Sequence, residues 1–325
     1  MAGKRIVKRA DFSDEVYVAD AFRAFIEEKE ANNLSEATLT SYEESYTKLY
    51  KFAMFDEETQ TQELTQQLLY KWIGVMKLDG IKISSINHYL RDIRSFAYWC
   101  MDDARKYIEP KYKIKMLEEQ EEIPKCFPDE DIALLLDKPG KRESFVNWRT
   151  WAIVNWVMGT GNRASTVCNV KIGDVDFKRK EIALRVAKNN KAQIIPLSGS
   201  LEAVLKEYIR IWRNGCQDEA YLFCNVSEDK LTTNALRQAF EEYCADRGVN
   251  QHNIHGLRHS FAKGWVKNNG NMFALQKILG HATLAMTRRY VKLFGEDLKD
   301  DFEKFNPLDS IKRKAKRTQT VTSNR

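Results

Sequence analysis

The stretch 253-NIHGLRHSFAKGW-265 places two histidines and an arginine within five positions. His255 and His259 have the i, i+4 spacing of two metal ligands on a zinc hydrolase helix, whereas His255 and Arg258 have the spacing of two groups that bind one anion. A zinc hydrolase also needs a glutamate after the first histidine, as the general base, and Gly256 stands there. No third ligand is obvious, so the sequence favours an anion site.

The same stretch is predicted to form a helix over Ile254–Lys267. Its buried stripe should consist of Leu257, Phe261 and Trp265. An adjacent face should hold, at i, i+3, i+4 and i+7, His255, Arg258, His259 and Ala262. An arginine offers a phosphate two parallel N–H donors, and the alternative is a buried arginine paired with a carboxylate. Gly256 weakens the helix by up to about 1 kcal/mol relative to Ala, which favours a later start.

Length and composition indicate a globular chain of about two domains. The 325 residues are 43% hydrophobic and 30% charged, which excludes a disordered or fibrous chain. The net charge of +6 and the pI of about 8.8 allow a polyanionic partner without requiring one. Much of the excess charge lies in two end segments, KRIVKR and IKRKAKR, where basic arms would follow phosphates or simply be solvated.

Several classes of protein are excluded by what the chain lacks. It has no run of about 18 apolar residues for a membrane span, and its N-terminus has no apolar segment of a secretory signal. The six cysteines never form a C-x-x-C pair, which is typical of reduced thiols in a cytosolic protein. We therefore expect a cytoplasmic protein that does not bind a membrane.

Residues 14–106 have the pattern of a compact bundle of four amphipathic helices, preceded by a basic arm at 1–13. Several basic side chains should lie on polar faces of these helices, where they could face DNA or water. They are Lys48, Lys51, Lys71, Lys77, Lys82, Arg91 and Arg94. Residues 107–125, with Pro110 and Pro124 among dense charge, are predicted to link this domain to the next.

Residues 126–294 are predicted to form a second, larger domain. The segment 145-FVNWRTWAIVNWVMGTGN-162 is apolar on nearly all sides, which indicates a buried helix that ends at Gly159 and Gly161. Three short alternating runs follow, DVDF, EIALRV and QIIPLS, which predict a small antiparallel sheet. The fold class is therefore mainly α with a small antiparallel β-sheet.

Four further polar residues of this domain are candidates for a site. Arg163 follows a Gly-Thr-Gly break at the start of a helix, where a cation opposes the helix dipole and calls for an anion. Lys188 and Lys191 stand on a tight hairpin from which a lysine could reach a cleft. His281 lies at a helix break, and Tyr290 lies on the helix after it.

This ordered set of residues resembles the tyrosine recombinase (phage integrase) family. The set is Arg163, Lys188, His255, Arg258, His281 and Tyr290. Its local contexts match as well: TGNR, K-x-x-K before IPL, HGLRHSFA, LGH and RRY. The resemblance spans roughly residues 128–300, and residues 14–106 are similar to that family's core-binding domain. Two positions depart from the family: Thr166 and Gly256 stand where acidic residues are usual.

The resemblance implies a phosphoryl-transfer site that uses neither a metal nor a nucleotide cofactor. Tyr290 would attack a DNA phosphate and form a 3′-phosphotyrosyl link. Arg163 and Arg258 would bind the non-bridging oxygens, while Lys188 would protonate the leaving 5′-oxygen, with Lys191 a weaker candidate. His255 would act as acid or base near the tyrosine or the phosphate. His281 would add a hydrogen bond to the phosphate.

The resemblance also implies partners. Two basic domains would clamp one DNA duplex, and a tetramer would hold two sites, with accessory excision or bending proteins as further partners. Residues 295–325 would form a C-terminal helix and a basic tail that docks on a neighbouring subunit or on its own domain. The expected function is that of an integrase or transposase of a mobile genetic element. The alternatives are a Xer-like dimer resolvase, a tyrosine-type topoisomerase and an inactive DNA-binding regulator.

Overall fold

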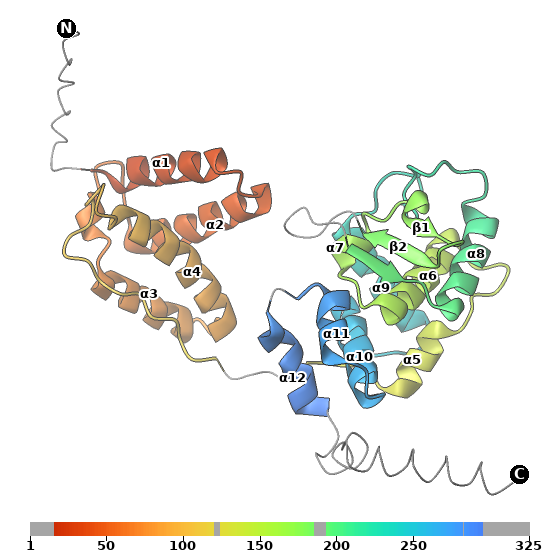
Figure 1. Cartoon of the computed structure of the whole chain (residues 1–325). Coiled ribbons are helices and arrows are strands. Elements are labelled where there is room, and N and C mark those ends of the chain that lie inside the picture. Colours follow the sequence, from red (N-terminus) through yellow and green to blue (C-terminus); the bar gives the residue numbers. More distant parts are fainter. Residues whose placement is uncertain (1–15, 120–123, 185–192, 282, 295–325) are drawn as a thin grey trace, which may run out of the picture. The chain divides into compact units, whose positions relative to one another are not determined.

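The computed structural model describes residues 16–119, 124–184, 193–281 and 283–294 (Figure 1). The chain divides between Glu121 and Glu122 into two compact units. It is mainly α-helical with one small antiparallel sheet, as predicted. The expected basic arm, the lysines Lys188 and Lys191, and the expected C-terminal helix and tail lie outside the described residues.

The first unit is the predicted bundle of four helices. They are α1 (Val18–Ala31), α2 (Glu36–Ala53), α3 (Gln66–Leu78) and α4 (Ile83–Cys100), with a short 3-10 helix at Thr61–Glu63. Apolar side chains, several of them aromatic, form the core, because the helices carry them at helical spacing. Phe25 lies at its centre, with ring centroids 5.5 Å from Phe96 and 5.8 Å from Trp99. These contacts join α1 to α4.

The first part of the predicted linker packs on this helical unit. Ile108 and Ile114 are buried in its core. The amide of Asn87 on α4 donates to the carbonyl of Leu117 at 2.9 Å and accepts from the Leu117 N–H at 2.8 Å. Residues 107–119 therefore extend the first unit rather than cross freely to the second. This packing could not be predicted from the sequence, since isolated apolar residues in a charged segment have no periodicity.

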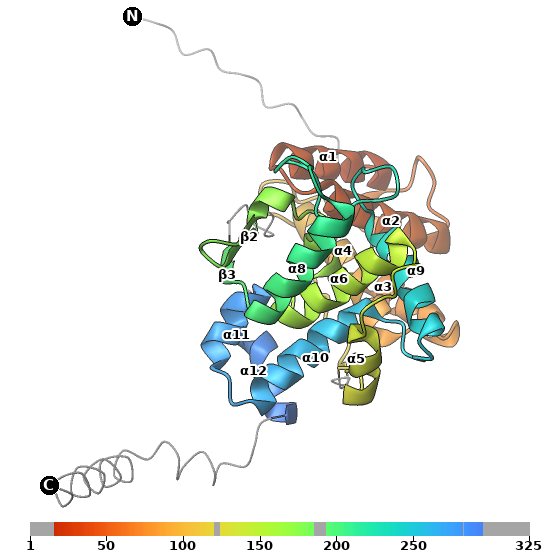
Figure 2. The ribbon, with the colours of Figure 1, turned by 90° about the vertical axis from the view of Figure 1, so that its right-hand side faces the viewer.

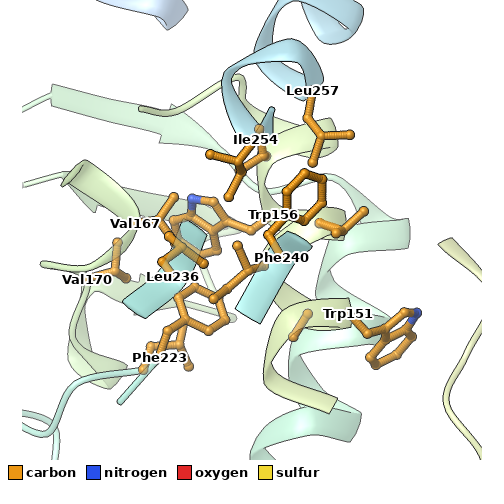
Figure 3. Close-up of a cluster of buried hydrophobic side chains, with 14 of the residues drawn as sticks. Trp151, Trp156, Val167, Val170, Phe223, Leu236, Phe240, Ile254 and Leu257 are labelled. Carbon is orange, nitrogen blue, oxygen red and sulfur yellow. The ribbon is translucent and has the colours of Figure 1, made fainter. Parts of the chain in front are cut away.

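The second unit is built around α6 (Phe145–Thr160), the helix predicted to be buried. Figure 3 shows Trp156 of this helix among Phe223, Phe240 and Leu257 from later parts of the chain. Ser144 begins the helix by accepting a hydrogen bond from the Asn147 N–H. The other helices of this unit are α5 (Asp129–Leu136), α7 (Ala164–Val167), α8 (Gly199–Trp212), α9 (Thr233–Asp246), α10 (Ile254–Lys267), α11 (Met272–Leu279) and α12 (Leu284–Phe294), with a 3-10 helix at Ile172–Asp174.

The predicted sheet has three antiparallel strands in the order β1-β2-β3. They are β1 (Val175–Asp176), β2 (Glu181–Leu184) and β3 (Gln193–Pro196). Ile182 is paired with Ile195, and both side chains are buried in the main core of the unit. The alternation of buried and more exposed residues along β2 is what the sequence pattern predicted.

Helix α10 has the predicted bounds, so the later start favoured by Gly256 does not occur. Asn253 begins the helix by accepting a hydrogen bond from the His255 N–H at 3.0 Å. A Cβ atom at Gly256 would lie 2.8 Å from Phe127 Cε2 and 3.0 Å from the Lys125 carbonyl oxygen. The glycine therefore lets the chain segment before α5 approach the first turn of α10.

The predicted buried stripe of α10 is only partly correct. Leu257 is fully buried, but Phe261 and Trp265 are half-buried. Ala262 and Val266 are buried more deeply, with α11 and α12 packed against them in a small second core. This difference arises because α10 is covered on two sides, which a single stripe cannot describe (Figure 2).

Two further observations concern the part of the chain that the structure describes. All six cysteines are unpaired, and four of them are buried. None of the helices described is both long enough and apolar enough to cross a lipid bilayer.

Candidate active site around Tyr290

Arg258 lies at the centre of the site, with only 3% of its surface exposed. Its Nη1 donates to the Gly161 carbonyl at 2.7 Å, and its Nη2 donates to the Leu279 carbonyl at 2.9 Å. These carbonyls belong to the C-terminal ends of α6 and α11, which are the negative ends of the helix dipoles. Both helix ends therefore fix the guanidinium and stabilise its charge.

Gly161 makes this arrangement possible. Its φ of +64° is in the left-handed region that favours glycine, and it ends α6. A Cβ atom there would lie 2.5 Å from Phe261 Cδ1 and 2.7 Å from Leu279 Cδ2. The absence of a side chain lets the end of α6 contact α10 and α11, which brings the Gly161 carbonyl to Arg258.

His281 follows α11 and is held between two partners. Its Nε2 accepts a hydrogen bond from Arg258 Nη2 at 3.0 Å, because an arginine can only donate. Its Nδ1 lies 2.9 Å from Thr287 Oγ1 on α12. Burial and the charge of Arg258 lower the pKa of His281 to about 4, so the ring is neutral at pH 7. A phosphate that bonds to His281 would therefore replace one of these partners.

Tyr290 points its hydroxyl at His259. The Tyr290 Oη lies 2.6 Å from His259 Nδ1, and 5% of the tyrosine is exposed. Burial raises the pKa of Tyr290 and outweighs the lowering effect of Arg258. Arg163 and Arg258 are thus close enough to favour the phenolate, but burial has the larger effect, so the tyrosine is not made more acidic.

His255 and Arg163 lie at the exposed side of the site. The ring centroid of His255 is 4.7 Å from that of His259, and the two rings meet edge to face. Desolvation, Arg258 and Arg163 lower the pKa of His255. Arg163 precedes the first turn of α7, and its Nη1 lies 4.0 Å from where a Cβ of Gly280 would be.

The site concentrates positive charge without an anion to balance it. Within the described part of the chain, neither Arg163 nor Arg258 is paired with a carboxylate, so the alternative of a buried Arg258–carboxylate pair does not occur. Burial and Arg163 lower the pKa of Arg258 to about 10, which still leaves it protonated at pH 7. Buried Arg213, in contrast, bonds Glu228 at 3.0 Å. The arrangement around Arg258 is suited to binding an anion.

The structure thus brings together five of the six residues that the sequence identified, and the sixth, Lys188, lies outside the described residues. The sequence placed His259 on the same helix face as His255 and Arg258 but gave it no part in the reaction, and Thr287 was not singled out at all. Thr287 is fully buried and stands three positions before Tyr290, so the helical period of α12 could have pointed to it. The part of the chain that the structure describes contains no group of three or more acidic, histidine or cysteine residues that could hold a metal ion.

Known proteins resemble the chain in sequence. Residues 127–296, more than half of the chain, match the phage integrase family. Tyrosine recombinase XerA of Pyrococcus horikoshii is 27% identical over 304 residues, which cover 92% of this chain and 98% of XerA. Tyrosine recombinase XerC of Chromobacterium violaceum is 27% identical over 292 residues, covering 89% and 95% of the two chains.

Two solved structures share the fold. The integrase of transposon Tn1549, in complex with transposon right end DNA, has a TM-score of 0.68 at 17% identity, with 89% of this chain and 99% of that chain covered. Lambda integrase, as a dimer bound to a core site, has a TM-score of 0.67 at 12% identity, with 85% and 95% covered. At these identities the likeness concerns the fold.

Proposed function

The chain belongs to the phage integrase family, and on that premise we propose that it exchanges DNA strands through a covalent 3′-phosphotyrosyl intermediate. The observation that carries the proposal is the placement of the Tyr290 hydroxyl, 2.6 Å from His259, beside the buried guanidinium of Arg258. A nucleophile next to a preorganised anion site is what attack on a phosphodiester requires.

In the proposed reaction, Tyr290 Oη forms a bond to phosphorus while the bond from phosphorus to the 5′-oxygen breaks. The 5′-oxygen takes a proton from Lys188, a role that rests on the family resemblance. A 5′-hydroxyl of a second strand then reverses these steps and releases the tyrosine. Because each step exchanges one phosphoester for another, the bond energy is conserved and no nucleotide cofactor is needed.

Arg163 and Arg258 are proposed to bind the non-bridging oxygens, whose charge grows in the transition state. Two backbone carbonyls hold Arg258 in place, whereas Arg163 is exposed, where a bound phosphate would be within its reach. His255 faces the same side and is assigned to an acid–base or hydrogen-bonding role at the phosphate. His281 is assigned a hydrogen bond to the phosphate.

The two units are proposed to bind one duplex, with the helical first unit as the core-binding domain. Of the seven basic side chains that could face either DNA or water, six are exposed, and Arg94 is half-buried. We propose a tetramer on two DNA sites, with accessory excision or bending proteins as further partners. A solved tetramer of lambda integrase bound to a Holliday junction supports this assembly by analogy.

The biological role that we favour is integration or transposition of a mobile element. The Tn1549 integrase supports it as a relative in fold. Xer-like dimer resolution is the second candidate, because the XerA relative covers 92% of this chain. The sequences that become linked to the protein distinguish the two roles: the ends of a mobile element in the first case, and one fixed chromosomal site in the second.

The test is capture of covalent adducts. The protein is incubated with sheared DNA of its source organism in EDTA, and DNA that stays attached in SDS is sequenced. Tyr290→Phe should abolish the adducts while leaving duplex binding intact. Tyr208→Phe is the matched control, because Tyr208 is buried in the same unit and its hydroxyl has no hydrogen-bond partner among the described residues.

Each outcome decides between the proposals. Discrete adducts that are lost only in Tyr290→Phe support the reaction, and their sequences identify the role. Adducts that persist in Tyr290→Phe contradict the choice of nucleophile. Tight duplex binding without adducts contradicts strand exchange by the protein alone and favours a DNA-binding regulator. Relaxation of supercoiled DNA without exchange between sites favours a topoisomerase.

A further inference from the structure

His259 is a neighbour of the nucleophile that the proposed reaction has not yet used. Within the described residues, the Tyr290 hydroxyl bonds to this imidazole alone, at 2.6 Å from its Nδ1. The two side chains come from α10 and α12, which pack against each other through Ala262 and Val266. His259 is half-buried, so packing fixes the ring close to the oxygen that would react.

The direction of this hydrogen bond follows from the charge states of its partners. Burial raises the pKa of Tyr290, so the phenol keeps its proton at pH 7. Burial, followed by the charges of His255, Arg258 and Arg289, lowers the pKa of His259 to about 4, so the imidazole is neutral. The phenol therefore donates, and the Nδ1 lone pair of His259 accepts.

We propose that His259, rather than His255, takes the phenolic proton of Tyr290 during DNA cleavage. This inference rests on the proposed function. As Tyr290 Oη bonds to phosphorus, its proton moves to His259 Nδ1, the phosphorus–O5′ bond breaks, and the 5′-oxygen takes a proton from the general acid. On rejoining, the imidazolium returns its proton to Tyr290 Oη, so protons and electron pairs balance.

The negative charge of the scissile phosphate would stabilise the protonated form of His259. In the structure its neighbours are cations and imidazoles, which disfavour a positive ring. A phosphodiester brings one negative charge into this group, and the transition state develops more. An imidazolium formed next to that charge is stabilised just when the proton arrives.

His255 is less well placed for the same step. It is exposed, in the first turn of α10, and its ring meets the ring of His259 rather than the phenol. Among the hydrogen bonds of the described residues, none joins His255 to Tyr290. This leaves His255 available to the phosphate on the exposed side of the site.

The test compares two substitutions at position 259 with one at position 255. His259→Asn keeps a polar atom close to the place of Nδ1 but cannot take up a proton, and His259→Phe keeps only the bulk of the ring. His255→Asn is the matched control one turn away. Single-turnover formation of the covalent adduct is followed on a duplex that contains the captured target site.

We expect both His259 variants to slow adduct formation by about 10²-fold or more, and His255→Asn to slow it less. A second substrate carries sulfur in place of the bridging 5′-oxygen, which makes the leaving group independent of the general acid. The His259 defect should persist on this substrate, whereas a Lys188→Ala defect should disappear. This pattern would place the role of His259 away from the leaving group, and the rescue described next separates proton transfer from a merely structural role.

A more acidic phenol provides the rescue. Difluorotyrosine at position 290 needs less help to lose its proton, so it should restore the rate of His259→Asn by about tenfold or more relative to tyrosine. A misfolded variant would not be rescued. The inference is overturned if His259→Asn cleaves at the wild-type rate, if sulfur substitution alone rescues it, or if difluorotyrosine does not. Absence of adducts in the wild type would instead overturn the proposed function and this inference together.

Discussion

The two units both bury ionisable side chains, but they satisfy them in different ways. In the first unit, Asp92 accepts hydrogen bonds from Ser41 at 2.6 Å and Ser45 at 2.8 Å. In the second unit, Arg258 and Arg163 have no carboxylate partner among the described residues, and nearby histidines are held neutral. The hydrogen bonds of Asp92 satisfy its carboxylate within the protein, so this network stabilises the fold. The positive charge around Arg258 is not balanced within the described residues, so this network is suited to binding an anion.

The largest expected effect is on the rate of DNA cleavage, when the unpaired positive charge of Arg258 is removed. Arg258→Gln removes a fixed donor from the developing phosphate charge, so adduct formation should fall by about 10²–10³-fold. Arg213→Gln is the matched control, since Arg213 is equally buried but is paired with Glu228. Its effect should be on stability and not on cleavage. The contrast between the two kinds of network fails if both variants lose cleavage equally, as single-turnover rates would show.

Changes to the hydrogen-bond network of Asp92 should instead alter the stability of the first unit. Asp92→Ala leaves the fully buried hydroxyl of Ser45 without its acceptor, so the free energy of unfolding of the first unit should fall by about 1–3 kcal/mol. Asp103→Ala is the control, because Asp103 is exposed and water screens its ion pair with Lys111, so its removal should change stability little. Urea unfolding measures both. If both variants lowered the free energy of unfolding equally, the buried hydrogen bonds of Asp92 would contribute no more than an exposed ion pair.

The sequence predicted the elements better than the contacts. The bounds of α10 followed from the periodicity of its sequence, and the ordered residues of the site from their resemblance to a family. The bond between His259 and Tyr290 joins residues 31 positions apart and depends on the packing of α12 on α10, which no local pattern encodes. Likewise, the packing of residues 107–119 on the first unit depends on single side chains such as Ile108.

Two glycines of α10 test how closely the helix is fitted to its surroundings. Gly256→Ala should lower the free energy of unfolding by about 1–3 kcal/mol, because the new Cβ would lie 2.8 Å from Phe127 Cε2. Gly264→Ala, with no neighbouring atom within 4 Å, should raise it by up to about 1 kcal/mol through helix propensity. Thermal and urea unfolding give the sign. Stabilisation by both alanines would contradict the close fit at Gly256.

The neutral histidines predict how stability depends on pH. His259 and His281 have pKa values of about 4 in the folded protein and about 6.5 when unfolded. Between these values the unfolded chain binds more protons, so the free energy of unfolding should fall as the pH is lowered from 6.5 to 4. Carboxylates contribute to the same trend, so the measurement is the difference from His281→Asn. The variant should show a weaker dependence, and parallel curves would contradict a neutral His281.

The smallest effect should be at the surface of the first unit. Lys48 Nζ contacts the hydroxyl of Tyr89 and lies 4.0 Å from the centroid of its ring, but no carboxylate of the described residues neutralises it. If it binds a DNA phosphate, Lys48→Ala should reduce the slope of log affinity against log salt by about 0.9. Lys111→Ala should leave the slope unchanged, because Asp103 already neutralises Lys111. Equal slopes for both variants would mean that the cation of Lys48 faces only water, so that the first unit would bind DNA through other side chains.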